Sequence, residues 1–166
     1  MKKTKCAYFA GGCFWCITPI FADTNGVISV MSGYCGGDEI NPTYEDVKAQ
    51  KTNHRETIRI EYDEDKVSYK QLLDIFFDNV DLYDDGGQYI DRGHSYTLAV
   101  YYNDKKEKLI VENKIKEYEK TVYVSIENYK EFYKAEEYHQ DYYLKNPKEF
   151  EEELINSGRK TKWEKT

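Results

Sequence analysis

Residues 5–21 read KCAYFAGGCFWCITPIF, and this stretch decides the fold. The first part, residues 5–10, is short, apolar and aromatic, which predicts a buried strand. A glycine pair at 11–12 ends the strand, because glycine allows the chain to turn sharply. The following residues, 13–21, are expected to form a short helix. The chain therefore begins with a strand and a helix joined by a sharp turn.

The remaining chain continues this alternation of strands and helices. Further strands are predicted at 27–34, 57–62, 96–102 and 122–126, and helices after the capping residue Ser68 and at 104–121 and 131–144. The helix at 104–121 is expected to bury a stripe made of Leu109, Val111, Ile115 and Tyr118. The order strand, helix, strand, strand, helix, strand is typical of an α+β two-layer sandwich. We therefore expect helices packed on a mostly antiparallel mixed sheet with a ferredoxin-like core.

Composition and charge limit the class of protein. The 166 residues suit a single domain over 1–166, with a basic tail expected to fray after about 158. The chain carries 24 basic and 31 acidic residues, and its net charge of -7 argues against nucleic-acid binding. No run of about 18 apolar residues occurs, and no small-x-small cleavage site follows the N-terminal apolar stretch. These features predict a cytoplasmic protein without a membrane segment.

The run Gly-Gly-Cys-Phe-Trp-Cys at 11–16 carries the strongest chemical signal. Cys13 is expected at a helix N-terminus, where unpaired backbone N–H groups and the helix dipole favour the reactive thiolate. Cys16 follows one helical turn later, so the two sulfurs can approach closely enough to bond. This spacing predicts a nucleophilic thiol and a resolving thiol. Phe14 and Trp15 place two rings beside the sulfur, which suits a methyl or thioether group.

Two other interpretations of the cysteines stay open. A structural zinc site needs four ligands, so Cys6, Cys13, Cys16 and Cys35 would have to converge without a second Cys-x-x-Cys pair. A general dithiol–disulfide oxidoreductase of the thioredoxin type is the other, although two bulky rings between the cysteines argue against it. Cys6 alone is expected to be an inert buried residue. We expect no metal site and no cofactor.

Two long irregular stretches, 36–55 and 80–95, hold further polar groups, and loops of this length are often functional. Cys35 lies among glycines, which suggests a thiol mobile enough to reach a partner. Considered alone, three other residues have ordinary interpretations: surface packing for Tyr44, a solvated carboxylate for Glu56 and a hydrogen-bonded core histidine for His139.

Taken together, these segments resemble the A-type peptide methionine sulfoxide reductases. The matching stretches run in the family's order from residue 10 to 147: AGGCFWC, SGYCGG, NPTYEDV, NHRE, GGQYIDRG with the later Tyr96, and EYHQDYYLKNP. The family's fold is an α+β two-layer sandwich, which agrees with the order of elements predicted above. The resemblance implies a catalytic domain that reduces methionine-S-sulfoxide, free or in oxidised proteins, and so repairs those proteins.

The resemblance also implies roles for particular residues. Cys13 is the catalytic nucleophile, and Phe14 and Trp15 hold the methyl group of the substrate. The sulfoxide oxygen and its pocket are assigned to polar residues: Glu56 gives the oxygen a proton, Tyr44 and Tyr96 hydrogen-bond it, and Asp91 lines the pocket. Burial against the rings is expected to keep the Glu56 carboxyl protonated near neutral pH.

The recycling step is where this chain departs from many members of the family. Those members carry resolving cysteines in a C-terminal tail, whereas no cysteine follows Cys35 here. The attack on the sulfoxide leaves Cys13 as a sulfenic acid, and Cys16, Cys35 or an external thiol must then form a disulfide with it. An external dithiol, in this family usually thioredoxin, restores the enzyme. We expect a monomer.

Overall fold

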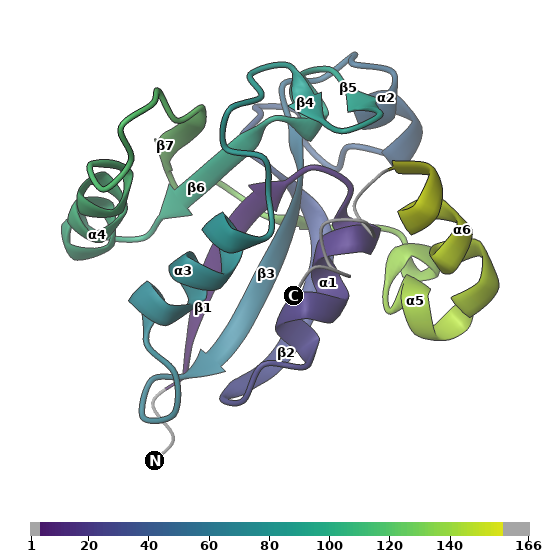
Figure 1. The fold of residues 1–166 in the computed structure, drawn as a ribbon. Helices are drawn as coiled ribbons and strands as arrows, with labels where there is room; N and C mark the ends of the chain where they lie inside the picture. The colour runs from purple at the N-terminus through teal and green to yellow at the C-terminus, as the bar shows by residue number, and fades with distance from the viewer. Residues whose placement is uncertain (1–3, 158–166) are drawn as a thin grey trace.

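The computed structural model describes residues 4–157 and contains a six-stranded sheet covered by helices (Figure 1). The strands of this sheet are β1 (Thr4–Gly11), β2 (Val27–Cys35), β3 (Arg55–Asp63), β6 (Leu98–Tyr102), β7 (Val124–Asn128) and β8 (Tyr133–Lys134). A separate hairpin consists of β4 (Gly87–Gln88) and β5 (Asp91–Arg92). The helices are α1 (Phe14–Ala22), α2 (Tyr44–Lys48), α3 (Tyr69–Asp78), α4 (Lys105–Ile115), α5 (Tyr142–Lys145) and α6 (Pro147–Ser157).

The ferredoxin-like core consists of strands β1, β2, β3 and β6 with helices α1 and α3. Along the chain these elements follow as β1-α1-β2-β3-α3-β6, and the strands lie in the order β6-β1-β3-β2, each antiparallel to its neighbour. β7 pairs parallel with β6 at one edge, and β8 pairs antiparallel with β2 at the other. In Figure 1, α1 and α3 lie in front of the same face of the sheet. The predicted α+β sandwich on a mostly antiparallel mixed sheet is confirmed.

The main hydrophobic core lies between the sheet and these two helices. Phe9 from β1 stacks on Phe76 from α3, with ring centroids 4.8 Å apart and an angle of 24° between the ring planes. A capping box fixes the start of α3: Ser68 Oγ accepts from the Gln71 N–H at 3.1 Å, and Gln71 Oε1 accepts from the Ser68 N–H at 2.8 Å. The helix start predicted at Ser68 is confirmed.

A second, smaller cluster covers the other face of the sheet. Its buried members are Tyr8, Ala10, Cys35, Ala99, Tyr101 and Phe132. Side chains alternate between the two faces along a strand, so consecutive residues of β2 point in opposite directions. Tyr34 accordingly packs in the main core and Cys35 in the second cluster. The sheet therefore lies between Cys35 and the helix that follows Cys13.

The helix predicted over 131–144 is wrong. This stretch instead contains β8, a 3₁₀ turn over Glu137–His139 and the short helix α5. Gln140 accounts for the difference, because its side chain accepts from the Ser32 N–H and donates to the Ser32 carbonyl, both at 2.9 Å. These bonds hold the segment against β2. Asp141 has φ of 53°, a left-handed conformation that a continuous right-handed helix does not contain.

The helix predicted over 104–121 is shorter than expected, because α4 ends at Ile115. The inner stripe is also partly wrong: Val111 is 0% exposed, whereas Leu109 is 56% exposed. Residues four apart lie on the same side of a helix, so buried Glu107, Val111 and Ile115 form the inner face. Leu109 lies two positions from Val111 and faces solvent.

Three further predicted boundaries can be compared with the structure. Tyr96 belongs to a 3₁₀ turn over His94–Tyr96, and strand β6 begins at Leu98. The predicted stop at Asn146-Pro147 separates α5 from α6, since proline is favoured in the first turn of a helix. The basic tail after 158 lies outside the described residues. Within residues 4–157, no helix combines the length and the apolar character needed to cross a membrane.

The contrast between Phe76 and Leu109 gives a test of the packing. Phe76→Ala removes a fully buried ring and is expected to lower the free energy of unfolding by about 3–5 kcal/mol. Leu109→Ala removes an exposed side chain and is expected to change it by no more than about 0.5 kcal/mol. Urea unfolding of both variants measures the difference, and equal losses would contradict this description of the core.

Candidate active site

The turn between β1 and α1 places Cys13 at the N-terminus of the helix. Gly12 has φ of 87°, a conformation that glycine adopts without strain. A Cβ at Gly11 would lie 2.9 Å from the Phe76 ring, so the glycine permits close packing against α3. Cys13 is the N-cap residue, and its carbonyl accepts the Cys16 N–H at 3.1 Å. The glycine pair thus fixes where the Cys13 thiol lies.

Glu56, the second residue of β3, lies beside this helix start. Its Oε1 accepts a hydrogen bond at 3.2 Å from the Phe14 N–H, one of the groups that a helix leaves unpaired at its N-terminus. The residue is 1% exposed, and burial raises the pKa of its carboxyl group to about 8. The Phe14 N–H and the Tyr96 phenol oppose this rise in pKa, whereas the negative charge of Asp91 adds to it.

Glu56 is therefore a neutral acid at pH 7, not the solvated carboxylate that the residue alone suggests. Its Oε2 is buried and has no hydrogen-bond partner within the described part of the chain. Because Oε1 already accepts the Phe14 N–H, Oε2 is the oxygen available to carry the proton. The structure thus holds a proton donor at the N-terminus of α1.

Tyr44, Tyr96 and Asp91 gather around the same carboxyl group. Tyr44 begins α2, Tyr96 ends the 3₁₀ turn before β6, and Asp91 lies in β5. Burial raises the pKa of both phenols, and the charge of Glu56 adds to the rise. Both phenols therefore stay protonated and can donate hydrogen bonds. The structure brings together every residue that the resemblance assigns to the sulfoxide oxygen.

Trp15 is held in place by two aromatic partners. Its indole Nε1–H donates to His139 Nδ1 at 2.9 Å, and its ring stacks on Tyr142 at 4.0 Å with an angle of 11°. Burial lowers the pKa of His139 to about 4, so the ring is neutral and Nδ1 can accept. The predicted hydrogen-bonded core histidine is confirmed. The sequence alone does not indicate that its partner is Trp15.

Phe14 and Tyr44 complete an aromatic cluster that begins directly after Cys13 in the chain. Their rings are stacked, with centroids 6.4 Å apart, and Tyr44 also stacks with Trp15 at 6.2 Å. Glu136 fixes this arrangement, because its carboxylate accepts from the Tyr44 N–H at 2.9 Å and from the Tyr34 hydroxyl at 2.7 Å. These two hydrogen bonds outweigh burial and lower the pKa of Glu136. The sequence analysis missed Glu136, whose only signal is its place before the EYHQ run.

The cysteines divide into two groups. A hydrogen bond from the Cys13 thiol to Cys16, burial, and the nearby Cys16, Glu56 and Asp91 raise the pKa of Cys13 well above its ordinary value. This shift opposes the effect of the helix N-terminus, which favours the thiolate. Cys6 and Cys35 lie with the second cluster on the other face of the sheet, so the four thiols do not converge as a zinc site requires.

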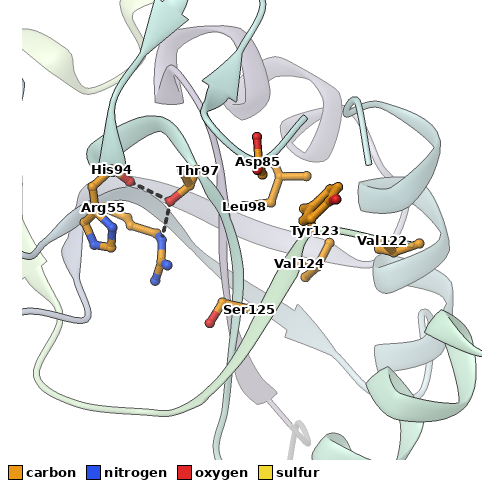
Figure 2. A pocket seen from close by; sticks show the side chains of 9 residues that line it. All are labelled: Arg55, Asp85, His94, Thr97, Leu98, Val122, Tyr123, Val124 and Ser125. Carbon is orange, nitrogen blue, oxygen red and sulfur yellow. Dashed lines mark hydrogen bonds between the residues drawn. The ribbon is translucent and has the colours of Figure 1, made fainter. Parts of the chain in front are cut away.

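A pocket of about 400 Å³ is lined by Arg55 and Thr97, the sequence neighbours of Glu56 and Tyr96, among other residues (Figure 2). Its lining residues are Arg55, Asp85, His94, Thr97, Leu98, Val122, Tyr123, Val124 and Ser125. Figure 2 shows a hydrogen-bond chain in which Arg55 Nε–H donates to Thr97 Oγ1 at 2.8 Å and Thr97 Oγ1 donates to the His94 carbonyl at 2.6 Å. This chain ties the turn that carries Tyr96 to the strand that carries Glu56.

Comparison with known proteins agrees with this geometry. The family model described as peptide methionine sulfoxide reductase matches residues 5–166. MsrA of Bacillus licheniformis is 44% identical over 164 residues, covering 95% of this chain and 91% of the relative. MsrA 2 of Staphylococcus aureus strain MRSA252 is 44% identical over 160 residues, covering 93% of this chain and 90% of the relative. The chain belongs to the peptide methionine sulfoxide reductase family.

Solved structures of relatives support the assignment of this chain to the reductase family. Reduced Mxr1 from Saccharomyces cerevisiae superposes with a TM-score of 0.81 at 27% identity, covering 88% of this chain and 87% of that one. Methionine sulfoxide reductase A of Corynebacterium diphtheriae gives a TM-score of 0.80 at 28% identity, covering 87% and 76%. The protein is therefore an A-type oxidoreductase that reduces methionine sulfoxide.

The hydrogen bond between Trp15 and His139 can be tested through stability. His139→Phe keeps an aromatic ring but removes the acceptor, and the loss is expected to cost about 1–3 kcal/mol at pH 7. The pKa of His139 is lower in the folded reductase than in the unfolded chain, so the wild type loses this stabilisation as pH falls below about 6.5. Urea unfolding at pH 7 and pH 5 should show the gap narrowing at pH 5. A gap that is equal at both pH values would contradict a neutral His139.

Proposed function

We propose that this reductase converts methionine-S-sulfoxide to methionine by attack of Cys13 on the substrate sulfur, with Glu56 as the proton donor. The observation that carries this proposal is the buried, neutral Glu56 carboxyl at the N-terminus of the helix that Cys13 caps. A sulfoxide oxygen is a poor leaving group until it receives a proton. A carboxyl group whose pKa is raised to about 8 supplies that proton at neutral pH.

The first step balances without an added reductant. Cys13 Sγ attacks the sulfoxide sulfur, and the oxygen passes to Cys13. Methionine then leaves, and Cys13 remains as a sulfenic acid. Glu56 Oε2 gives its proton to the oxygen, and the thiol proton of Cys13 returns to the carboxylate. Glu56 therefore passes a proton to the substrate oxygen, takes one from Cys13, and is protonated again at the end of the step. The raised pKa of Cys13 fits this sequence, because its proton leaves only when Glu56 can accept it.

The surrounding groups bind the two ends of the sulfoxide. We assign the oxygen to the Tyr44 and Tyr96 hydroxyls, which donate where negative charge develops. We assign the methyl group to the faces of Phe14 and Trp15, which suit an apolar group. Asp91 helps to keep Glu56 protonated, because its negative charge raises the pKa of that carboxyl.

Cys16 is the resolving thiol in this proposal. It already hydrogen-bonds to Cys13, whereas Cys35 is separated from both by the sheet. The Cys16 sulfur attacks the Cys13 sulfenic acid, a Cys13–Cys16 disulfide forms, and water leaves. An external dithiol then accepts the bond and regenerates both thiols. Thioredoxin is the dithiol we propose, and a structure of the yeast relative Mxr1 in complex with Trx2 is known.

The physiological setting follows from the same features. Substrates are free methionine sulfoxide and oxidised proteins, so the reaction repairs oxidised proteins. The residues of the proposed site lie on elements of one folded unit over residues 4–157, which fits one catalytic domain, and we propose that it acts as a monomer. The free cysteines fit a reducing compartment such as the cytoplasm.

Glu56→Gln tests the proton donor. The amide keeps the shape of the side chain but cannot donate a proton of comparable acidity, so the single-turnover rate is expected to fall about 10²- to 10⁴-fold. Because the protonated carboxyl is the active form, the wild-type rate should fall as pH rises through about 8, and the variant should lack this decline. Single-turnover release of methionine from blocked methionine-S-sulfoxide measures both effects. Unchanged turnover would remove Glu56 from this role.

Cys16→Ser and Cys35→Ser form a matched pair that tests the resolving thiol. Without reductant, both variants are expected to release about one equivalent of methionine from the S epimer and none from the R epimer. With thioredoxin, Cys16→Ser should then turn over slowly, whereas Cys35→Ser should keep the wild-type rate. The reverse pattern would identify Cys35 as the resolving thiol.

A further inference from the structure

The two sulfurs of the proposed disulfide differ in access. Cys16 is 2% exposed and lies in the first turn of α1 among residues buried against the sheet. Cys13 is partly exposed at the N-cap, outside the first turn of the helix. The mechanism proposed above also requires a sulfoxide to reach the Cys13 sulfur. Catalysis makes no such requirement for Cys16.

The geometry of thiol–disulfide exchange makes this difference decisive. The attacking thiolate approaches along the line of the S–S bond, from the side opposite to the leaving sulfur. Cys13 is partly exposed at the N-cap, so a thiolate can approach its sulfur from outside the helix. Cys16 is 2% exposed and is followed on α1 by buried Ile17 and Thr18, so a thiolate that attacks its sulfur would first have to displace packed side chains.

We propose that the external dithiol attacks Cys13, and that Cys16 is the leaving thiol. This inference rests on the Cys13–Cys16 disulfide proposed above. The attacking thiolate forms an intermolecular disulfide with Cys13, the Cys13–Cys16 bond breaks, and Cys16 leaves as a thiolate that takes up a proton. The second thiol of the dithiol then attacks its own partner sulfur, releases Cys13, and leaves the reductant as a disulfide. Two electrons and two protons pass to the reductase.

The sulfoxide and the reductant must therefore reach the Cys13 sulfur one after the other by the same route. A reductase whose resolving cysteine lies on a C-terminal tail can present a different sulfur to its reductant. In this chain, the sulfur that takes the oxygen also takes the incoming thiol. Specificity for a dithiol protein then depends on residues around Cys13, because Cys16, the other sulfur of the proposed disulfide, is buried.

A trapped intermediate tests this order of attack. The disulfide form is prepared by one turnover with blocked methionine-S-sulfoxide, and peptide masses verify the Cys13–Cys16 bond before reductant is added. A thioredoxin with its second active-site cysteine changed to serine is then added, free thiols are alkylated, and fragment masses locate the intermolecular bond. We expect thioredoxin on Cys13 and the alkyl label on Cys16. Thioredoxin on Cys16 or Cys35 would overturn the inference.

Cys16 can attack the intermolecular disulfide and expel thioredoxin before the thiols are alkylated. A second measurement then tests which sulfur the thioredoxin thiolate attacks. Cys13→Ser and Cys16→Ser are each made in a background that also carries Cys6→Ser and Cys35→Ser, so that one thiol remains. That thiol is converted to its mixed disulfide with thionitrobenzoate. The same single-cysteine thioredoxin should release the yellow thiol from Cys13 about ten-fold faster or more than from Cys16. Equal rates, or faster release from Cys16, would overturn the inference.

The two proposals fail in distinguishable ways. Absence of the Cys13–Cys16 bond before the reductant is added contradicts the proposed resolving role of Cys16. Presence of that bond followed by thioredoxin on Cys16 contradicts only the order of attack.

Discussion

The hydrogen bond from the Phe14 N–H to Glu56 Oε1 joins the first turn of α1 to the beginning of β3, and the site depends on it. It satisfies a backbone donor that the helix leaves unpaired, and it holds the carboxyl group within reach of the Cys13 sulfur. The bond lowers the pKa of Glu56, yet burial raises it further, so the acid stays protonated. A more exposed carboxyl in the same place would ionise and could not donate.

Keeping a polar group buried is costly unless the surroundings hold it in place. A buried polar atom without a partner costs about 1–3 kcal/mol, and Glu56 Oε2 is such an atom. Packing around the site compensates for this cost. Glu136 anchors α2 through the Tyr44 N–H, and His139 anchors Trp15. These contacts come from the irregular segment after β7, which explains why that segment closes over the helix start instead of forming a helix of its own.

The sequence predicted the regular part of the fold well, because the strands and α3 have clear periodicity and caps. It failed over 131–144, where apolar spacing resembles a helix but Gln140 bonds to the backbone of Ser32, which lies far away along the chain. For the site, the residues themselves indicated Cys13 and Cys16, whereas Glu56, Tyr44 and Tyr96 came from the family resemblance alone. The helix N-terminus alone favours a lower pKa for Cys13, whereas burial, Cys16 and the carboxyls that the fold brings near raise it.

The alternation of side chains along β2 determines which of the thiols oxidants can reach. A protein that repairs oxidation damage works where peroxides and related oxidants are abundant, and such oxidants attack thiols as well as methionine. Cys35 is fully buried behind the sheet, where burial raises its pKa to about 12 and keeps it in the unreactive thiol form. An oxidant that approaches the N-terminus of α1 therefore meets Cys13, whereas Cys35 lies on the other face of the sheet. The sheet acts as a barrier between that approach and the Cys35 thiol.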